Sequence, residues 1–144
     1  MLLQIMILML LEAPGLIQTE GAVTLTVGIN NLKNQKGKLG LAVFRTAEGW
    51  PDMWEQAERS TLVLIDSKPQ EIMISDLPLG RYAVSVFHDE NSSGDMDKNF
   101  IGIPKEGYGV SNNAKAGLFG PPKFEDAQFD LSSNETRIDI EITY

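Results

Sequence analysis

The sequence contains no cysteine and a single histidine, His88. Without cysteine the chain can form no disulfide, thiolate metal site or cysteine nucleophile, and one histidine excludes a metal site built from several histidines of one chain. Basic residues are also few, because 12 Lys and Arg stand against 20 Asp and Glu and give a formal net charge of −8. Nucleic acids and anionic membrane surfaces are both bound through clustered basic residues. The overall charge therefore disfavours both kinds of partner.

The apolar run at the N-terminus is too short to span a membrane. It covers Met1–Leu11, with Gln4 as its one polar residue, whereas a spanning helix needs about 20 residues. The run matches the apolar core of a secretory signal peptide, although no Lys or Arg precedes it and no clean Ala-x-Ala cleavage site follows it. We expect residues 1–21 to be a removable leader and the protein to be periplasmic or extracellular. The alternative is that the run forms a buried first strand or helix.

Alternation of apolar with polar or small residues dominates residues 22–144, which we expect to fold as a single domain. Such alternation is typical of half-buried strands, and it predicts strands over residues 23–29, 39–44, 61–65, 71–75, 82–87, 124–131 and 137–144. The first two strands are expected to form a hairpin across the turn at residues 34–38. About seven strands and no long amphipathic helix predict an all-β fold, an antiparallel β-sandwich.

Residues 89–123 form a connection far longer than an ordinary loop. Disorder fits this segment poorly because it contains several large apolar residues that need burial: Phe100, Ile101, Ile103, Tyr108, Leu118 and Phe119. We therefore expect one long ordered loop of the Ω type that caps an end of the sandwich.

Two stretches of the sequence resemble known families. The run Asp76-Leu-Pro-Leu-Gly-Arg-Tyr-Ala-Val-Ser-Val-Phe87 is similar to the L-P-x-G-x-Y-x-V-x-V signature of prealbumin-like and carboxypeptidase-regulatory-like sandwiches, a signature of fold rather than function. Residues 86–114, together with Phe119-Gly-Pro-Pro-Lys-Phe-Glu-Asp-Ala127, resemble the bacterial family catalogued as domain of unknown function 2141. This resemblance extends over about residues 23–144. It implies a small exported protein with an immunoglobulin- or prealbumin-like sandwich, and it implies no activity.

The acidic loop at residues 89–97 is the most distinctive chemical feature. Side chains that carry oxygen occupy every second position: Asp89, Asn91, Ser93, Asp95 and Asp97. Gly94 is the sixth residue of this loop, where calcium loops turn sharply, and alternate oxygens can face a hard cation such as Ca²⁺. The twelfth residue is Phe100, where an EF-hand has its bidentate glutamate. The loop thus predicts a Ca²⁺ site without EF-hand geometry; the alternative is a solvated turn.

His88 lies at the end of a predicted strand, directly before the acidic loop. A hydrolase that uses His88 with the acidic loop is therefore one hypothesis, although it requires a nucleophile at hydrogen-bond distance from the imidazole. No complete Gly-x-Ser-x-Gly motif accompanies the histidine. The alternative is a histidine packed at the end of a sheet and hydrogen-bonded to backbone.

Four aromatic residues are candidates for an interaction surface with a protein or saccharide partner: Trp50, Trp54, Tyr108 and Phe119. Clusters of exposed aromatic side chains commonly bind such partners, and the alternative is that these four fill the ends of the sandwich as core. Together the observations favour a non-enzymatic binding or interaction module. A purely structural domain, whose long loop only covers a sheet edge, is a further alternative.

Overall fold

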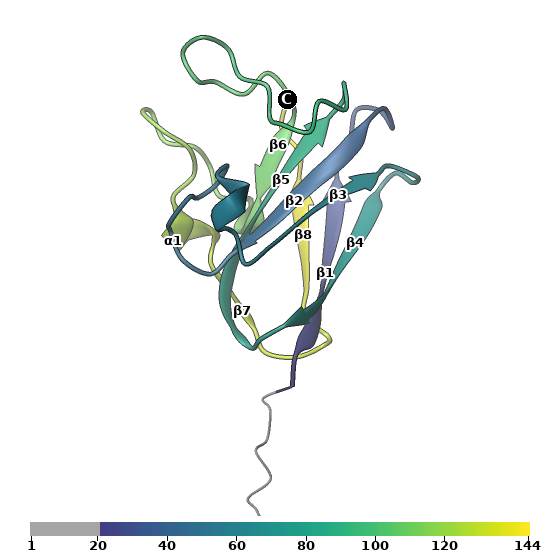
Figure 1. Ribbon diagram of the computed structural model, residues 1–144, viewed down its shortest axis with the longest axis vertical. Coiled ribbons are helices and arrows are strands. Elements are labelled where there is room, and N and C mark those ends of the chain that lie inside the picture. Colours follow the sequence, from purple (N-terminus) through teal and green to yellow (C-terminus); the bar gives the residue numbers. More distant parts are fainter. Residues whose placement is uncertain (1–20) are drawn as a thin grey trace, which may run out of the picture.

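The computed structural model describes residues 21–144, so the predicted leader lies outside the described residues apart from Gly21. Two β-sheets of three and five strands pack together, with only short helical turns beside them (Figure 1). The prediction of an all-β sandwich is therefore confirmed. None of the helices formed by residues 21–144 has the length and apolar character needed to cross a membrane.

Strands distant in the sequence are neighbours in both sheets. The smaller sheet has the order β4 (Gln70–Leu77), β1 (Val23–Asn30) and β8 (Arg137–Glu141). The larger has the order β3 (Arg59–Leu64), β2 (Lys38–Phe44), β5 (Gly80–Asp89) and β6 (Tyr108–Val110), with β7 (Phe129–Leu131) also paired to β5. The helical turns are η1 (Trp54–Gln56), η2 (Ser111–Asn113) and α1 (Phe124–Ala127). All strand pairs are antiparallel except β1 with β8, which are parallel.

The predicted hairpin between the first two strands is wrong, because β1 and β2 belong to different sheets. Leu32 is only 2% exposed and packs in the core between the sheets, which anchors the connection as it crosses. Positive φ angles at Asn31 (64°) and Gly37 (73°) change the direction of the chain on either side of this anchor. Burial of one side chain in the connection thus favours a crossover rather than a tight turn.

The strand predicted over residues 124–131 is also only partly correct. Its first half is the single turn α1, and only Phe129–Leu131 pairs with β5. Phe124 and Ala127 are three residues apart, so one helical turn places both on one side, where they pack with Phe44 in the second core cluster.

The central strands β2 and β5 are buried on both faces. On β2, Leu39, Leu41 and Val43 face the smaller sheet, while Ala42 and Phe44 belong to a second cluster on the outer face. Side chains alternate between the two faces of a strand, so a strand with two apolar faces needs a cover on each. The outer cover consists of the segment around η1 together with α1.

Gly40 of β2 lies beneath this outer cover. A Cβ at this position would collide with the rings of Trp54 and Phe87, so we expect Gly40→Ala to lower the free energy of unfolding by about 1–3 kcal/mol through overpacking. Gly117→Ala is the matched control, since a Cβ there would contact nothing, and its effect should stay within about 0.5 kcal/mol. Equal midpoints for the two variants in urea unfolding would contradict this account of the outer cluster.

The long connection does not cap the sandwich with its apolar side chains. Phe100, Ile101, Ile103, Leu118 and Phe119 are all exposed, and only Tyr108 is half-buried. At the end of the sandwich the sheets are closed by polar rather than apolar contacts, since fully buried His88 is hydrogen-bonded to Tyr144, which is 50% exposed. The expected single loop is also wrong, because β6 and η2 interrupt residues 89–123 and β6 pairs with β5. The expected burial of the apolar residues is wrong as well.

Candidate functional site

The acidic loop winds around the carboxylate of Asp89, the last residue of β5. Asp89 is fully buried, and its Oδ1 accepts the N–H of Ser93 (3.0 Å) while its Oδ2 accepts the N–H of Gly94 (2.8 Å). Ser93 Oγ also donates to Oδ1 of Asp89 (3.3 Å). The positive φ of 87° at Gly94 permits this turn. The first residue of the predicted calcium loop is therefore the centre of the loop's own hydrogen bonds.

Two more of the predicted metal ligands join the same network. Asn91 Nδ2 donates to Oδ2 of Asp97 (2.6 Å), and Asn91 Oδ1 accepts the N–H of Ser93 (3.1 Å). The exposed Asp95 takes part only through its backbone, whose carbonyl accepts from Ser93 Oγ (2.9 Å). The structure thus brings Asp89, Asn91, Ser93 and Asp97 together. Within residues 21–144, however, no three His, Asp or Glu side chains are arranged so that they could hold a metal ion as they stand.

Glu106 is a further carboxylate at this loop, beyond the four at residues 89–97, and the sequence analysis does not select it. The chain returns to the loop through a bridge between Lys98 and Pro104, and the N–H of Lys105 donates to the carbonyl of Asp97 (2.7 Å). The next residue, Glu106, is only 9% exposed, and its Oε2 accepts the N–H of Asp97 (3.4 Å). Glu106 is not recognisable as part of the loop from the sequence because it lies 17 residues after Asp89. The one sequence feature that could have indicated it is its position within residues 86–114, the run that resembles the family.

Burial is the largest cause that raises the pKa of Glu106 to about 7; the backbone N–H of Asp97 acts in the opposite direction, and the carboxylates of Asp97 and Asp89 add smaller upward contributions. No basic side chain within residues 21–144 neutralises the charge of these carboxylates. In the described part of the chain, Asp89, Asp95, Asp97 and Glu106 take part in no ion pair. Glu90, the remaining carboxylate of the loop, is paired with Lys33 (2.8 Å). The other four carboxylates therefore form a region of concentrated, unpaired negative charge.

His88 joins three separate segments by hydrogen bonds. It is fully buried, with Nε2 at 2.7 Å from the carbonyl oxygen of Lys36 and Nδ1 at 2.7 Å from the hydroxyl of Tyr144. A carbonyl can only accept, so Nε2 carries the proton and Nδ1 accepts from the Tyr144 hydroxyl. Ser85, a nearby serine, donates its hydroxyl to the carbonyl of Pro51 (2.7 Å) instead. Both nitrogens of the imidazole are thus used within the fold.

The four aromatic residues do not share one surface. Trp50 packs edge-on against Phe44, with ring centroids 5.4 Å apart, and its Nε1 donates to the carbonyl of Pro122 (2.7 Å). Trp54 packs against Phe87, with centroids 4.9 Å apart. The other two lie elsewhere, since Tyr108 lines a groove of about 420 Å³ along β6 and Phe119 is fully exposed.

A family model described as "Uncharacterized protein conserved in bacteria (DUF2141)" matches residues 27–139 of the chain. This match spans most of both sheets and the whole acidic loop, and it confirms the resemblance noted in the sequence. No curated protein and no solved structure matches the chain. The chemistry of the site must therefore be argued from the side chains themselves.

Proposed function

We propose that this chain, which belongs to the DUF2141 family of bacterial proteins, is an exported, non-enzymatic binding module whose acidic loop is ordered by Ca²⁺. The description of the family assigns no activity. The observation that carries the proposal is the gathering of Asp89, Asp97 and buried Glu106 at one loop, where within residues 21–144 no cationic side chain pairs with them.

The hydrogen bonds of the loop support a cation rather than a simple solvated turn. Asp89 accepts the N–H of Gly94, the residue at the sharp bend, so the bend that a calcium loop requires is present, and Ca²⁺ would order the side-chain oxygens around it. Ca²⁺ takes six to eight oxygen ligands, and Glu106 offers the acidic oxygen that Phe100 cannot provide. Binding through Asp97 requires its bond with the Asn91 amide to open, which frees oxygens of both residues. The ion would thereby replace one hydrogen bond and relieve the repulsion among the carboxylates.

The environment of His88 supports binding over hydrolysis. A general base must reach a proton of the substrate, whereas both nitrogens of this fully buried imidazole lie 2.7 Å from protein oxygens. We therefore assign His88 a structural role. The exported location is proposed from the apolar run at residues 1–11 and from the family resemblance, and Ca²⁺ sites with dissociation constants of ~10⁻⁴–10⁻³ M are common in extracellular modules.

Calorimetric titration of the chelator-treated protein with Ca²⁺ tests the proposal. We expect a dissociation constant of ~10⁻⁴–10⁻³ M and, at tenfold excess over that constant, a stabilisation of about 1.4 kcal/mol measured by thermal unfolding. Asp97→Asn should weaken binding about tenfold because it removes an ionised ligand. Glu135→Gln is the control, since this exposed residue lies between β7 and β8 at the opposite end of the molecule (Figure 1). Absence of both heat and thermal shift at millimolar Ca²⁺ would refute the proposal.

A further inference from the structure

Two loop tips of this chain project apolar side chains into solvent. The first tip, residues 98–105, follows the acidic loop, and the second tip, residues 115–123, precedes α1. Their large apolar side chains are between 54% and 100% exposed: Phe100, Ile101, Ile103, Leu118 and Phe119. Among residues 21–144, the three most exposed large apolar side chains all belong to these tips. Such exposure opposes the hydrophobic effect and indicates an interaction surface.

The backbone of the first tip holds its apolar residues outward. Oδ1 of Asn99 accepts the N–H groups of Ile101 and Ile103, each at 3.0 Å, and the N–H of Asn99 donates to the carbonyl of Ile103 (2.8 Å). The positive φ of 84° at Gly102 completes the bend. These bonds close the tip on itself, so Phe100 projects from an ordered turn.

In the second tip a different turn holds the apolar side chains outward. Gly117 and Gly120 pair as an isolated bridge, which places Leu118 and Phe119 at the apex between them. A Cβ added at either glycine would contact nothing within 4 Å. The apex therefore extends into open space rather than resting on the sheet.

Lysines bound both tips. Lys98 and Lys105 are at the ends of the first tip, and Lys115 and Lys123 are at the ends of the second. Lys98 pairs with Asp52, whereas the other three form no ion pair with any residue in the range 21–144. Residues 98–123 contain these four lysines and a single acidic residue, the buried Glu106, in a chain of net charge −8. The charge of the whole chain therefore conceals a locally basic segment.

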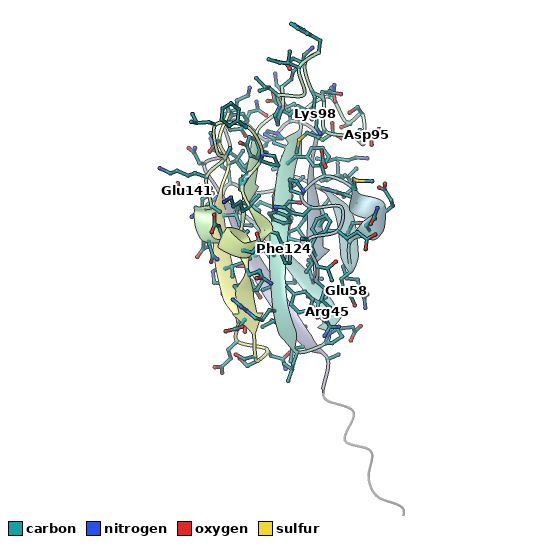
Figure 2. All side chains as sticks on the ribbon, turned by 90° about the vertical axis from the view of Figure 1, so that its left-hand side faces the viewer. Arg45, Glu58, Asp95, Lys98, Phe124 and Glu141 are labelled. Atoms are coloured by element: carbon teal, nitrogen blue, oxygen red, sulfur yellow. The ribbon has the colours of Figure 1, made fainter. Side chains whose placement is uncertain are left out.

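Both tips extend beyond the strands on the same side of the molecule. Figure 1 shows them in green and yellow-green, reaching past β6 and α1. In Figure 2 the labelled Lys98 lies at the end of the molecule from which the first tip extends, with Asp95 of the acidic loop beside it. One flat partner can therefore face both tips.

We propose that the two tips dock on the surface of an anionic lipid bilayer, with their apolar side chains in the headgroup region and their lysines near lipid phosphates. Apolar residues flanked by basic ones are typical of interfacial binding, and each lysine near an anionic leaflet adds attraction. A protein partner of standard size covers a continuous area of about 800 Å², whereas these tips are separate projections of a few residues. The net charge of −8 disfavours such membranes for the chain as a whole, whereas the proposal concerns only the locally basic segment that carries the tips.

This inference rests on the proposed binding role and identifies the bilayer as the binding partner. The residues that would contact the bilayer belong to the two tips and not to the calcium loop. The acidic loop adjoins the first tip, since Lys105 donates its N–H to the carbonyl of Asp97. Ca²⁺ bound in that loop would reduce the negative charge that faces the bilayer. We therefore expect Ca²⁺ to strengthen docking.

Co-sedimentation with vesicles tests the inference. The full-length mature chain is mixed with vesicles of three parts phosphatidylcholine to one part phosphatidylglycerol, at low salt, with Ca²⁺ or with a chelator. We expect Phe100→Ser/Phe119→Ser to lower the partition coefficient about tenfold, because binding scales with the apolar area buried. Lys105→Gln and Lys115→Gln should each lower it about fivefold, and binding to pure phosphatidylcholine should be weak.

Leu64→Ser/Met73→Ser is the matched control, because these apolar residues of β3 and β4 are 71% and 64% exposed away from the tips, and it should bind as the unmodified chain does. Calorimetry of the Phe100/Phe119 variant should still show Ca²⁺ binding, which separates this inference from the proposal for the loop. The inference is overturned if the unmodified chain leaves the vesicles unbound under both conditions. It is equally overturned if the tip variant and the control bind alike.

Discussion

Replacing Glu106 by glutamine is expected to raise the free energy of unfolding by about 3 kcal/mol near pH 8 and to leave it almost unchanged near pH 4. The carboxyl of Glu106 has its pKa raised from 4.5 to about 7, first by burial and then by the charges of Asp97 and Asp89. Below pH 4.5 it is protonated in both folded and unfolded chains. Between about pH 4.5 and pH 7 the unfolded chain loses this proton while the folded chain keeps it, so over that range the native protein loses stability that the glutamine variant keeps.

Urea unfolding of chelator-treated protein at several pH values measures this difference. Other carboxyls, such as Glu90, whose hydrogen bond with Lys33 lowers its pKa, contribute equally to both proteins and cancel. Glu135→Gln serves as the control, because Glu135 is exposed, and it should give a difference near zero at every pH. A constant difference between Glu106→Gln and the native chain across this range would contradict the burial argument. Ca²⁺ should stabilise the native chain more than the glutamine variant if Glu106 is a ligand.

The second large effect is expected at His88, where substitution by alanine should lower the free energy of unfolding by about 3–4 kcal/mol. The substitution leaves a cavity at a fully buried position, and it removes the partner of the Lys36 carbonyl and of the Tyr144 hydroxyl. The two lost hydrogen bonds cost stability in addition to the lost packing. Denaturant unfolding of the variant at neutral pH measures the loss.

Tyr144→Phe is the matched variant for His88, because it keeps the ring and removes only the hydroxyl, which bonds to Nδ1 of His88 (2.7 Å) and accepts the N–H of Lys33 (3.2 Å). It should cost only about 1–2 kcal/mol. The two substitutions share a contact, so a double-mutant cycle should show coupling between them. A His88→Ala protein as stable as the native chain would argue against the structural role. In that case the hydrolase hypothesis would again deserve a search for substrate.

The candidate site divides clearly into what local sequence predicts and what it does not. The sequence indicates the loop from Asp89 to Asp97 as a candidate cation site, because oxygen-bearing side chains occupy every second position and Gly94 is the sixth residue. Glu106 was missed because its place beside Asp97 depends on the return of the chain across the first tip. For the two tryptophans the sequence leaves surface and core open, and contacts with Phe44 and Phe87 from other segments place them largely in the outer cluster.

The sequence by itself determined the fold class, because alternation along a strand is a local consequence of burying one face. Only the tertiary structure decided that β1 and β2 lie in different sheets, that Glu106 meets Asp97, and that Phe100 and Phe119 remain in solvent. These outcomes depend on which distant segments fill each space, and the free energy of that packing belongs to the whole chain rather than to any short stretch of it.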